Sequence, residues 1–342
     1  MAPKKKKSKP ASVAKAARLL KRADNILIIT HVRPDGDTLG SAFALMYALE
    51  DMGKRVCVAC DSKITKKFLF LTGEEDLEPR FKPDFIVAVD IASPQLLGKS
   101  MEEFADRIDL VIDHHPTNTR FARWNLVADT SSAAGIVVFR LLQKMRAPFS
   151  QRITDAIYVA VSTDTGCFRY SNTDAETLRI AAALVENGAD SEHLNQILFE
   201  VVSPGHVALQ GLALKTLHYF ANGKIAIIRV TLDLIAKAKA TDDDIDNISN
   251  LARNIEGVEV GLSFREVAPD EFKISARSNG DVDVAHICSL FGGGGHKRAA
   301  GCQLKGEINE VEGRIVTAIL NEYFSDEDDH VENAFTGDYT DI

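Results

Sequence analysis

Aspartate and histidine side chains recur at the ends of short apolar runs in the first half of this chain. The segments concerned are THVRPDGDTLGS, FIVAVDIAS, LVIDHHPTN and AVSTDTGCF, which contain His31, Asp35, Asp37, Asp90, Asp113, His114, His115 and Asp164. Carboxylates with only a few imidazoles suit hard to borderline divalent cations better than a zinc cage. A metal-dependent phosphoryl-transfer site is therefore the first hypothesis to test.

The spacing of the first segment has a mechanical meaning. His31 ends an apolar run, and the proline and glycines around Asp35 and Asp37 break regular structure, so that a compact loop can form. Residues two apart in extended backbone share a face, so the two carboxylates can serve neighbouring ions. Asp90 would then lie between the ions as a bridging ligand. Two ions roughly 3.5–4 Å apart can activate a water and stabilise the leaving oxygen of an in-line displacement.

Each of these motifs also has a structural explanation. An isolated Asp-Gly-Asp is often a turn, and paired histidines after a strand are often a capping or surface pair. Carboxylates that converge on one crevice would, however, repel one another without cations. Taken together, the motifs favour a dinuclear metal site.

The elements that must position these residues follow from hydrophobic periodicity. Strand-like runs cover residues 25–31, 55–60, 85–92 and 110–115, and helical or continuous apolar patterns cover 41–53, 131–145 and 153–165. This alternation predicts an α/β fold, a mostly parallel sheet flanked by helices. Ligands of such sheets collect beyond the carboxyl ends of the strands, where most of the motifs fall. Asp164 is expected at the end of a helix.

The pattern changes after about residue 195 and predicts a smaller α+β domain. A helix opened by Ser203 and Pro204 would connect the domains, and the segment 241–257 is a further predicted helix. Strands are expected at 224–231, 258–267 and 272–278, and a glycine-rich loop, GGGGHKRAAG, precedes a terminal helix. The expected organisation is a disordered basic tail (1–14), a catalytic domain (15–200), a linker helix (201–220), a substrate-binding domain (221–325) and an acidic tail (326–342).

Composition narrows the functional class. The chain has 342 residues, 45% of them hydrophobic, and a net charge of -9, which argues against a protein that coats nucleic acid through overall basicity. A solvated tail is favoured for the basic N-terminus, although RNA binding or an import signal stays open. The odd number of cysteines favours reduced thiols and a cytoplasmic location. Cys57 and Cys60 are expected to be buried strand residues, and no apolar run approaches the ~20 residues of a membrane helix.

The motifs resemble those of a known family. HVRPDGD, the aspartate after FIVAV, DHHP and STDTG are similar to the four motifs of the DHH phosphoesterases, and GGGGHKRAAG is similar to the glycine-rich motif of their DHH-associated C-terminal domain. The resemblance covers roughly residues 15–325. The arrangement looks closest to the NrnA-type oligoribonuclease and pAp-phosphatase branch, whereas RecJ-type exonucleases are usually longer.

The resemblance implies roles for individual residues. One metal ion, usually Mn²⁺ with Mg²⁺ or Co²⁺ as alternatives, would be held by His31, Asp35 and Asp90. A second ion would be held by Asp37, Asp90, His114 and Asp164. Asp113 would orient His114, and His115 would face the scissile phosphate as electrostatic stabiliser or proton donor.

The second domain is expected to bind the substrate across an active-site cleft between the domains. Consecutive glycines present backbone N–H groups that can approach a phosphate closely. The candidate contacts are Arg265, Arg277, Ser278, Gly293, Gly294, Gly295, His296 and Arg298. A tight turn would also explain the glycines, and surface charge would explain the arginines almost as well.

The expected protein is therefore a metal-dependent phosphoesterase that hydrolyses short RNA oligonucleotides or 3′-phosphoadenosine 5′-phosphate (pAp). The alternatives are a cyclic- or linear-dinucleotide phosphodiesterase, a RecJ-type single-strand exonuclease and, from another class, a nucleotide- or RNA-binding module without turnover. The sequence does not rank these substrates, and it leaves cleavage polarity and a homodimeric state open.

Overall fold

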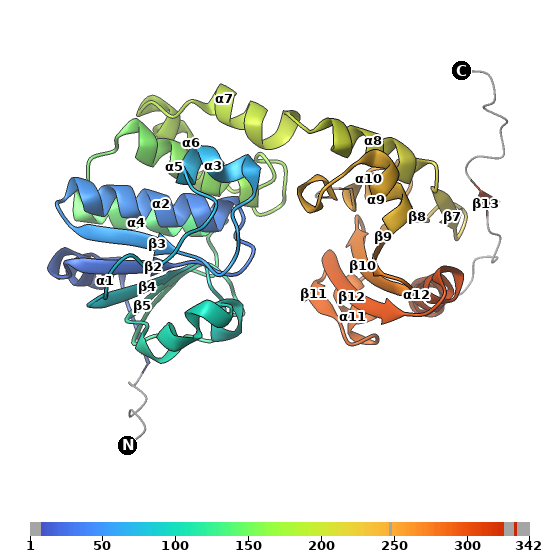
Figure 1. The fold of residues 1–342 in the computed structure, drawn as a ribbon, viewed down its shortest axis with the longest axis horizontal. Helices are drawn as coiled ribbons and strands as arrows, with labels where there is room; N and C mark the ends of the chain where they lie inside the picture. The colour runs from blue at the N-terminus through green and yellow to red at the C-terminus, as the bar shows by residue number, and fades with distance from the viewer. Residues whose placement is uncertain (1–7, 246–247, 325–331, 334–342) are drawn as a thin grey trace. The chain divides into compact units, whose positions relative to one another are not determined.

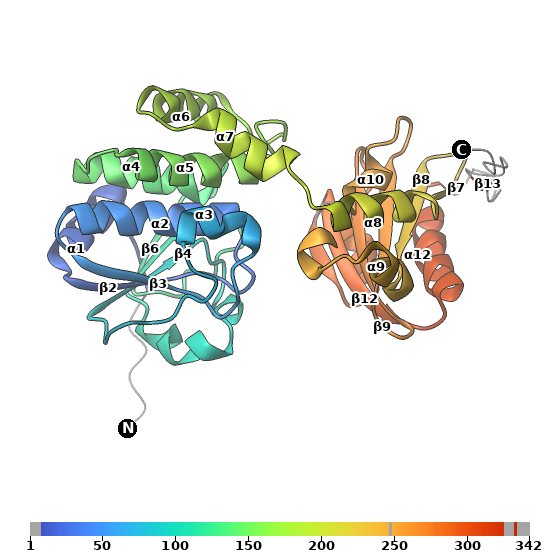
Figure 2. The same ribbon diagram turned by 45° about the horizontal axis from the view of Figure 1, so that its top comes forward.

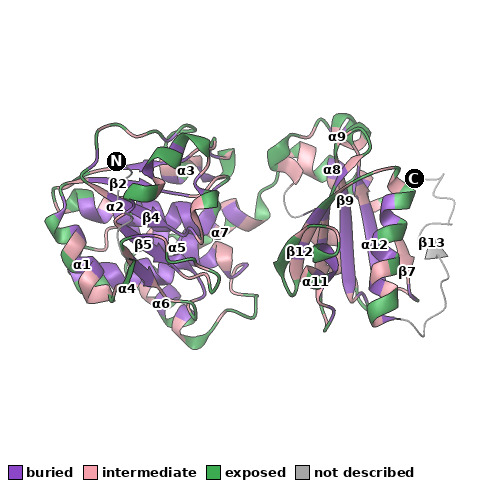
Figure 3. Cartoon of the chain, turned by 90° about the horizontal axis from the view of Figure 1, so that it is seen from below, coloured by how far each residue is buried: buried purple, intermediate pink, exposed green. Residues whose placement is uncertain are grey.

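The computed structural model describes residues 8–245 and 248–324, together with the backbone of 332–333. The chain divides into two compact units between Val201 and Val202 (Figure 1). Each unit is built on one sheet whose strands are largely buried (Figure 3).

The first unit contains a six-stranded sheet in which every neighbouring pair is parallel. Its order is β1-β6-β5-β4-β2-β3. The strands are β1 (Lys9–Pro10), β2 (Asn25–Ile29), β3 (Arg55–Ala59), β4 (Phe85–Val89), β5 (Leu110–Asp113) and β6 (Trp124–Val127). Continuous apolar runs form the central strands because both faces of the sheet are covered. The predicted parallel α/β architecture is confirmed.

Helices cover the two faces of this sheet unequally. The helices are α1 (Val13–Arg22), α2 (Gly36–Asp51), α3 (Leu69–Thr72), α4 (Ala134–Met145), α5 (Gln151–Asp164), α6 (Ala175–Glu186) and α7 (Ser191–Asn195). Figure 2 shows α2 and α4 along one face, with α6 in a layer farther out. The opposite face packs against Leu97, which follows the 3₁₀ segment Pro94–Leu96, and against Met101 and Phe104 of the 3₁₀ segment Lys99–Arg107. As predicted, Asp164 is the last residue of a helix.

The strand order places a switch point between β2 and β4. The chain leaves β2 for β3 on one side, and β4 pairs with β2 on the other side. Loops at such a point diverge, so the carboxyl ends of the two strands border a crevice in which ligands bind.

The second unit is a seven-stranded mixed sheet of order β11-β12-β10-β9-β8-β7-β13, in which β8 and β9 are parallel. The strands are β7 (His218–Phe220), β8 (Ile225–Val230), β9 (Val260–Ala268), β10 (Glu271–Ser278), β11 (Gly294–His296), β12 (Ala299–Lys305) and β13 (Glu332–Asn333). One face of β8 packs against α8 (Pro204–Leu214), α9 (Leu232–Ala238) and α10 (Asn250–Arg253). The other face of the sheet packs against α11 (Val284–Ser289) and α12 (Ile308–Tyr323).

Several predicted elements differ in the structure. The helix predicted for 201–220 ends at Leu214, because Thr216 accepts a hydrogen bond from the backbone N–H of Arg229 and the chain then pairs with β8 as β7. The predicted glycine-rich loop is the hairpin β11–β12. The predicted helix 241–257 consists of two short turns, Asp242–Ile245 and α10, and residues 246–247 between them lie outside the described part.

The predicted tails fall mostly outside the described residues. Of the basic segment 1–14, residues 1–7 lie outside, but β1 pairs with β6 and α1 begins at Val13. Of the acidic segment 326–342, only β13 is described, as a partner of β7.

Among the described helices, none alone has the length and apolarity to cross a membrane. One bent pair, residues Ser191–Glu200 with Pro204–Leu214, meets the criterion by length and composition only.

Candidate metal and substrate site

The carboxyl edge of the parallel sheet gathers the acidic and imidazole side chains of the first unit. His31 follows β2, Asp90 follows β4 directly, and Asp113 is the last residue of β5. Two helices complete the set. Asp35 is the N-cap of α2, with Asp37 in the first turn of that helix, and Asp164 closes α5.

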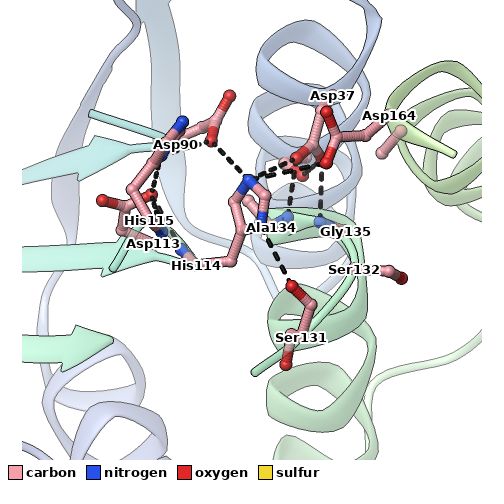
Figure 4. Close-up of polar contacts among 12 residues, drawn as sticks. Asp37, Asp90, Asp113, His114, His115, Ser131, Ser132, Ala134, Gly135 and Asp164 are labelled. Carbon is pink, nitrogen blue, oxygen red and sulfur yellow. Dashed lines mark hydrogen bonds and ion pairs between the residues drawn. The ribbon is translucent and has the colours of Figure 1, made fainter. Parts of the chain in front are cut away.

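One cluster of potential ligand atoms surrounds the ring of His114 (Figure 4). Its Nε2 lies 3.6 Å from a carboxylate oxygen of Asp37, of Asp90 and of Asp164. The Nδ1 of the ring lies 3.1 Å from the carbonyl oxygen of Ser131, which can only accept, so Nδ1 carries the proton of the neutral ring. The lone pair of Nε2 therefore faces three carboxylates, an arrangement that a cation would complete.

A second cluster contains His31, Asp35 and Asp90. His31 Nδ1 lies 2.8 Å from the carbonyl oxygen of Val32. The hydroxyl of Thr38 donates to Asp90 Oδ2 at 2.5 Å and lies equally close to His31 Nε2. Thr38 was not among the predicted site residues, although it stands one turn into α2 beside Asp35.

Asp90 belongs to the surroundings of both clusters. Its Oδ2 approaches His31 Nε2 at 3.8 Å and its Oδ1 approaches His114 Nε2 at 3.6 Å. The Oδ1 atom is buried and has no hydrogen-bond partner among the described residues, although His115 Nδ1 approaches it at 3.5 Å. A buried carboxylate oxygen without a partner is costly, and a bridging position between two cations would satisfy it.

The carboxylates of the site repel one another. Burial, followed by the charges of Asp90, Asp164 and Asp35, raises the pKa of Asp37 well above its ordinary value. Burial also raises the pKa of Asp90, with the charge of Asp35 adding to it, and raises the pKa of Asp164 to about 6. Divalent cations would restore the ionised forms. The donor set and its electrostatics therefore fit a pair of divalent ions.

The backbone of α4 positions Asp37, which sequence reasoning did not foresee. The N–H groups of Ala134 and Gly135 donate to its two oxygens at 2.6 and 2.9 Å. Ser41 donates to Oδ1 at 3.0 Å. The first turn of a helix favours an anion, so the carboxylate is held with its remaining lone pairs toward His114.

Asp113 contacts a different ring from the one expected. Its Oδ1 lies 2.8 Å from Nδ1 of His115 and accepts from the backbone N–H of His114 at 2.7 Å, whereas the ring of His114 bonds to Ser131. The hydrogen bond to Asp113 outweighs burial and raises the pKa of His115 to about 9. The side chain that Asp113 orients is therefore His115, and His115 carries a positive charge near neutral pH.

The substrate candidates of the second unit divide between two faces of its sheet. His296, Ala299, Arg277 and Gly261 are directly opposite one another across β11, β12, β10 and β9, so their side chains share a face. The next row consists of Gly294, Gly301, Ser275 and Ser263. At the β9 end these rows are covered, because Ser263 is buried and a Cβ on Gly261 would meet the backbone of Arg253 in α10. At the β11 end Gly294 and His296 are exposed, and we call this end of the sheet the open face.

The other candidates lie elsewhere. Ser278 is buried, as expected for the face opposite its neighbour Arg277, and its hydroxyl has no hydrogen-bond partner within residues 8–245 and 248–324. Arg265 shares the face of Arg277 but forms an ion pair with Asp242 at 2.6 Å. Arg298 is exposed in the turn of the hairpin.

The glycines of the hairpin are not equivalent. A Cβ on Gly293 would meet the carbonyl oxygen of Gly301 at 2.2 Å, and one on Gly295, which has a φ of 149°, would meet that of Ala299 at 2.5 Å. Local packing explains these two glycines. A Cβ on Gly294 would meet no atom of the described residues within 4 Å. Packing gives no reason for a glycine there, which leaves room for close approach of a ligand.

Comparison with known families divides the chain into the same two units. Residues 25–161 match the DHH family, N-terminal domain, and residues 222–325 match the DHHA1 domain. The first match holds all the proposed ligands except Asp164, which lies three residues beyond it.

Individual relatives span nearly the whole chain. The bifunctional oligoribonuclease and PAP phosphatase NrnA of Thermus thermophilus is 33% identical over 90% of this chain and 93% of its own length. The cyclic-di-AMP phosphodiesterase GdpP of Bacillus subtilis is 28% identical over 90% of this chain but only 49% of its own. The crystal structure of an exopolyphosphatase-related protein from Bacteroides fragilis superposes with a TM-score of 0.83 at 25% identity, covering 90% of this chain and 95% of that one.

Proposed function

Because this chain belongs to the DHH family of phosphoesterases, we propose that it hydrolyses short RNA oligonucleotides and pAp with two divalent ions. The observation that carries the metal assignment is the buried Oδ1 of Asp90, which lies between two clusters of ligand atoms and has no hydrogen-bond partner in the described part of the chain. The substrate assignment follows the name of the Thermus relative, which matches over nearly its full length.

The proposed ligand sets follow the two clusters. His31, Asp35 and Asp90 would hold one ion, and Asp37, Asp90, His114 and Asp164 would hold the other. Imidazole ligands favour Mn²⁺ over Mg²⁺, with Co²⁺ as a further candidate. When bound, such a pair of ions supplies an activated water and stabilises the leaving oxygen.

The remaining residues act on the phosphate directly. The imidazolium of His115, held by Asp113, would stabilise negative charge on the scissile phosphate or give a proton to the leaving oxygen. Arg277 of β10 and His296 of β11, with Gly294 two residues before His296 on the same strand, would bind the nucleotide on the open face of the second unit. The five unpaired cysteines support a location in the reducing cytoplasm.

The decisive experiment is a substrate panel with the metal-depleted protein. Linear dinucleotides, longer RNA, pAp and cyclic dinucleotides are each supplied with Mn²⁺, Mg²⁺ or Co²⁺, and released nucleotide is measured. We expect turnover of short RNA and pAp that requires a metal, is fastest with Mn²⁺ and stops reversibly on chelation. Full activity without metal would refute the dinuclear assignment. Preference for cyclic dinucleotides would favour the activity named for GdpP, which is similar to this chain over 90% of its length.

We also propose a homodimer that pairs α6 with its copy. The outward face of this helix is an apolar stripe of exposed residues, Ala175, Leu178, Ala182 and Val185. Arg179 and Glu186 flank Ala182, and neither has an ion-pair partner among the described residues. An antiparallel two-fold pairing centred near Ala182 would bring each arginine to the glutamate of the other copy.

A charge exchange tests this pairing. Arg179→Glu should dissociate the dimer because like charges then meet across the two-fold axis, and Arg179→Glu with Glu186→Arg should restore it. Molar mass by light scattering, measured over a range of protein concentrations, checks both. A wild-type monomer, or failure of the double variant to dimerise, would exclude the pairing.

A further inference from the structure

A left-handed turn follows the proposed ligand Asp164. Gly166, Cys167 and Phe168 have φ values of 56°, 57° and 62°. Two consecutive side chains other than glycine rarely adopt this region, because Cβ comes close to the following carbonyl oxygen. Such strain persists only where surrounding interactions hold it, and it is found most often at functional sites.

The surrounding interactions of this turn are visible. The N–H of Cys167 donates to the carbonyl of Ser162 at 2.7 Å, and that of Phe168 donates to the hydroxyl of Thr165 at 3.1 Å. The Phe168 ring packs edge-on against Tyr158, with centroids 5.8 Å apart. The amide of Asn172 donates to the carbonyl oxygen of Asp164 itself, at 3.1 Å. The turn is thus fastened to the core and to the proposed metal site.

The turn places the ring of Tyr170 flat on Gly166. A Cβ built on this glycine would lie 2.3 Å from Cζ and 2.5 Å from both Cε atoms, so the ring presents its face, not its edge, to the backbone. The side chain is 45% exposed. Its hydroxyl has no hydrogen-bond partner within the described part of the chain. A flat aromatic ring with one face supported by backbone and the rest toward solvent has the form of a stacking platform.

We propose that Tyr170 stacks against a nucleobase of the substrate, beside the residues proposed to hold metal. The inference rests on the proposed function and adds a contact that recognises the base and not the phosphate. Every nucleobase has a π-face, so the contact tolerates different sequences, as a nuclease for short RNA requires. Arg169 is exposed and its Nε donates to the carbonyl oxygen of Gly166 at 2.6 Å, so its positive charge lies near the ring, where the phosphate of a stacked nucleotide can lie.

The proposal can be tested by calorimetry, which measures the binding of two ligands that differ in whether they carry a base. Adenosine 5′-monophosphate and ribose 5-phosphate share sugar and phosphate and differ in the base. Tyr170→Ala should weaken binding of the nucleotide by about 5- to 150-fold, the range for loss of one stacked base, and leave ribose 5-phosphate unchanged. Tyr170→Phe should keep the affinity because it keeps the ring. Ser171→Ala, an exposed neighbour in the same loop, is the matched control.

Kinetics separates this inference from the proposed function. If the wild type cleaves a dinucleotide, Tyr170→Ala should raise its KM, but the same variant should match the wild type on an analogue whose stacked position is abasic. If the wild type does not cleave RNA, the calorimetry still decides whether the ring binds a base. An unchanged affinity of Tyr170→Ala for the nucleotide, or an equal loss of affinity for ribose 5-phosphate, would contradict the proposal that Tyr170 stacks against a base.

Discussion

Asp90 combines three unusual properties in one residue. Its φ of 58° is rare for a residue other than glycine, its side chain is buried, and one of its oxygens accepts no hydrogen bond from any described residue. The left-handed conformation directly after β4 turns the carboxylate toward both clusters of ligand atoms. Strain, burial and the missing hydrogen bond would each destabilise the fold, since the ion pair with His115 at 3.5 Å offsets burial only in part, and two bound cations would offset all three.

Asp90→Asn should therefore reduce activity more than Asp113→Asn, which is also an isosteric change. Asp90→Asn removes a charge that both ions would share, whereas Asp113→Asn disturbs only the residue that orients His115, a change typically costing about 10–100-fold. We expect Asp90→Asn to lose bound metal and more activity than Asp113→Asn, which should keep its metal. Elemental analysis beside kcat checks both. A worse defect in Asp113→Asn would reverse the assignment.

The hairpin β11–β12 separates structural glycines from a functional one. Gly295→Ala should destabilise the second unit, because the new Cβ would collide with backbone at a φ that side chains rarely adopt. Gly294→Ala should leave stability unchanged and raise KM, because its Cβ would occupy only the space left for a ligand. Urea unfolding and steady-state kinetics on both variants check the contrast. Equal KM for Gly294→Ala and wild type would leave this glycine without a role in binding.

An ion cluster ties β7 and β8 to α12 in the same unit. Glu312, almost fully buried, accepts from Arg229 Nε at 2.7 Å and lies 3.2 Å from His218 Nε2. Burial alone would raise the pKa of Glu312, but the hydrogen bonds from His218 and Arg229 lower it. Burial alone would lower the pKa of His218, but the bonds to Glu312 and to the Thr216 carbonyl raise it above 6.5.

The sign of each shift defines a pH window. The raised pKa of His218 stabilises the fold fully below 6.5, and this contribution disappears as pH rises through the folded value. The lowered pKa of Glu312 stabilises the fold at pH values above 4.5, and this contribution disappears as the pH falls through the folded pKa. The free-energy difference between wild type and His218→Gln should therefore be largest near about pH 6 and shrink toward about pH 9. Urea unfolding at these pH values measures it, and a difference that grows with pH would contradict the assignment.

At the scale of the whole molecule, the two units carry different chemistry. The residues proposed to hold metal all precede residue 165, and the arginine, histidine and glycines of the open face all follow residue 260. The chain has a net charge of -9, so attraction to long nucleic acid through overall charge is weak. Substrate binding must therefore depend on local contacts.

This division of chemistry between the two units predicts that substrate binding and metal binding can be lost separately. His296→Ala should raise KM for short oligonucleotides by about 10- to 150-fold, the cost of one charge-assisted hydrogen bond, and leave metal content intact. Asp164→Asn should instead lose metal. Turnover should also fall steeply as the RNA lengthens beyond a few nucleotides. Processive degradation of long single strands would favour a RecJ-type exonuclease, and loss of metal in His296→Ala would refute the division.

The sequence by itself determined the parallel sheet and the carboxyl edge at which most of the candidate ligands lie, whereas their assignment to two ions followed from the family resemblance. Apolar runs identify the strands, and residues that directly follow parallel strands must meet at one edge, so local pattern sufficed to bring His31, Asp90 and His114 together. The order of the motifs was enough to predict the family as well.

Only the tertiary structure decided which partner each side chain has. Asp113 lies against the ring of His115 because the chain turns after β5, and Asp37 is held by the first turn of α4, about a hundred residues away. Strand pairing places Arg277 and His296 in one row and turns Ser278 to the buried face. The ring of Tyr170 lies on Gly166 because three residues adopt left-handed backbone. Such contacts depend on packing between distant segments and on rare backbone angles, neither of which hydrophobic periodicity encodes.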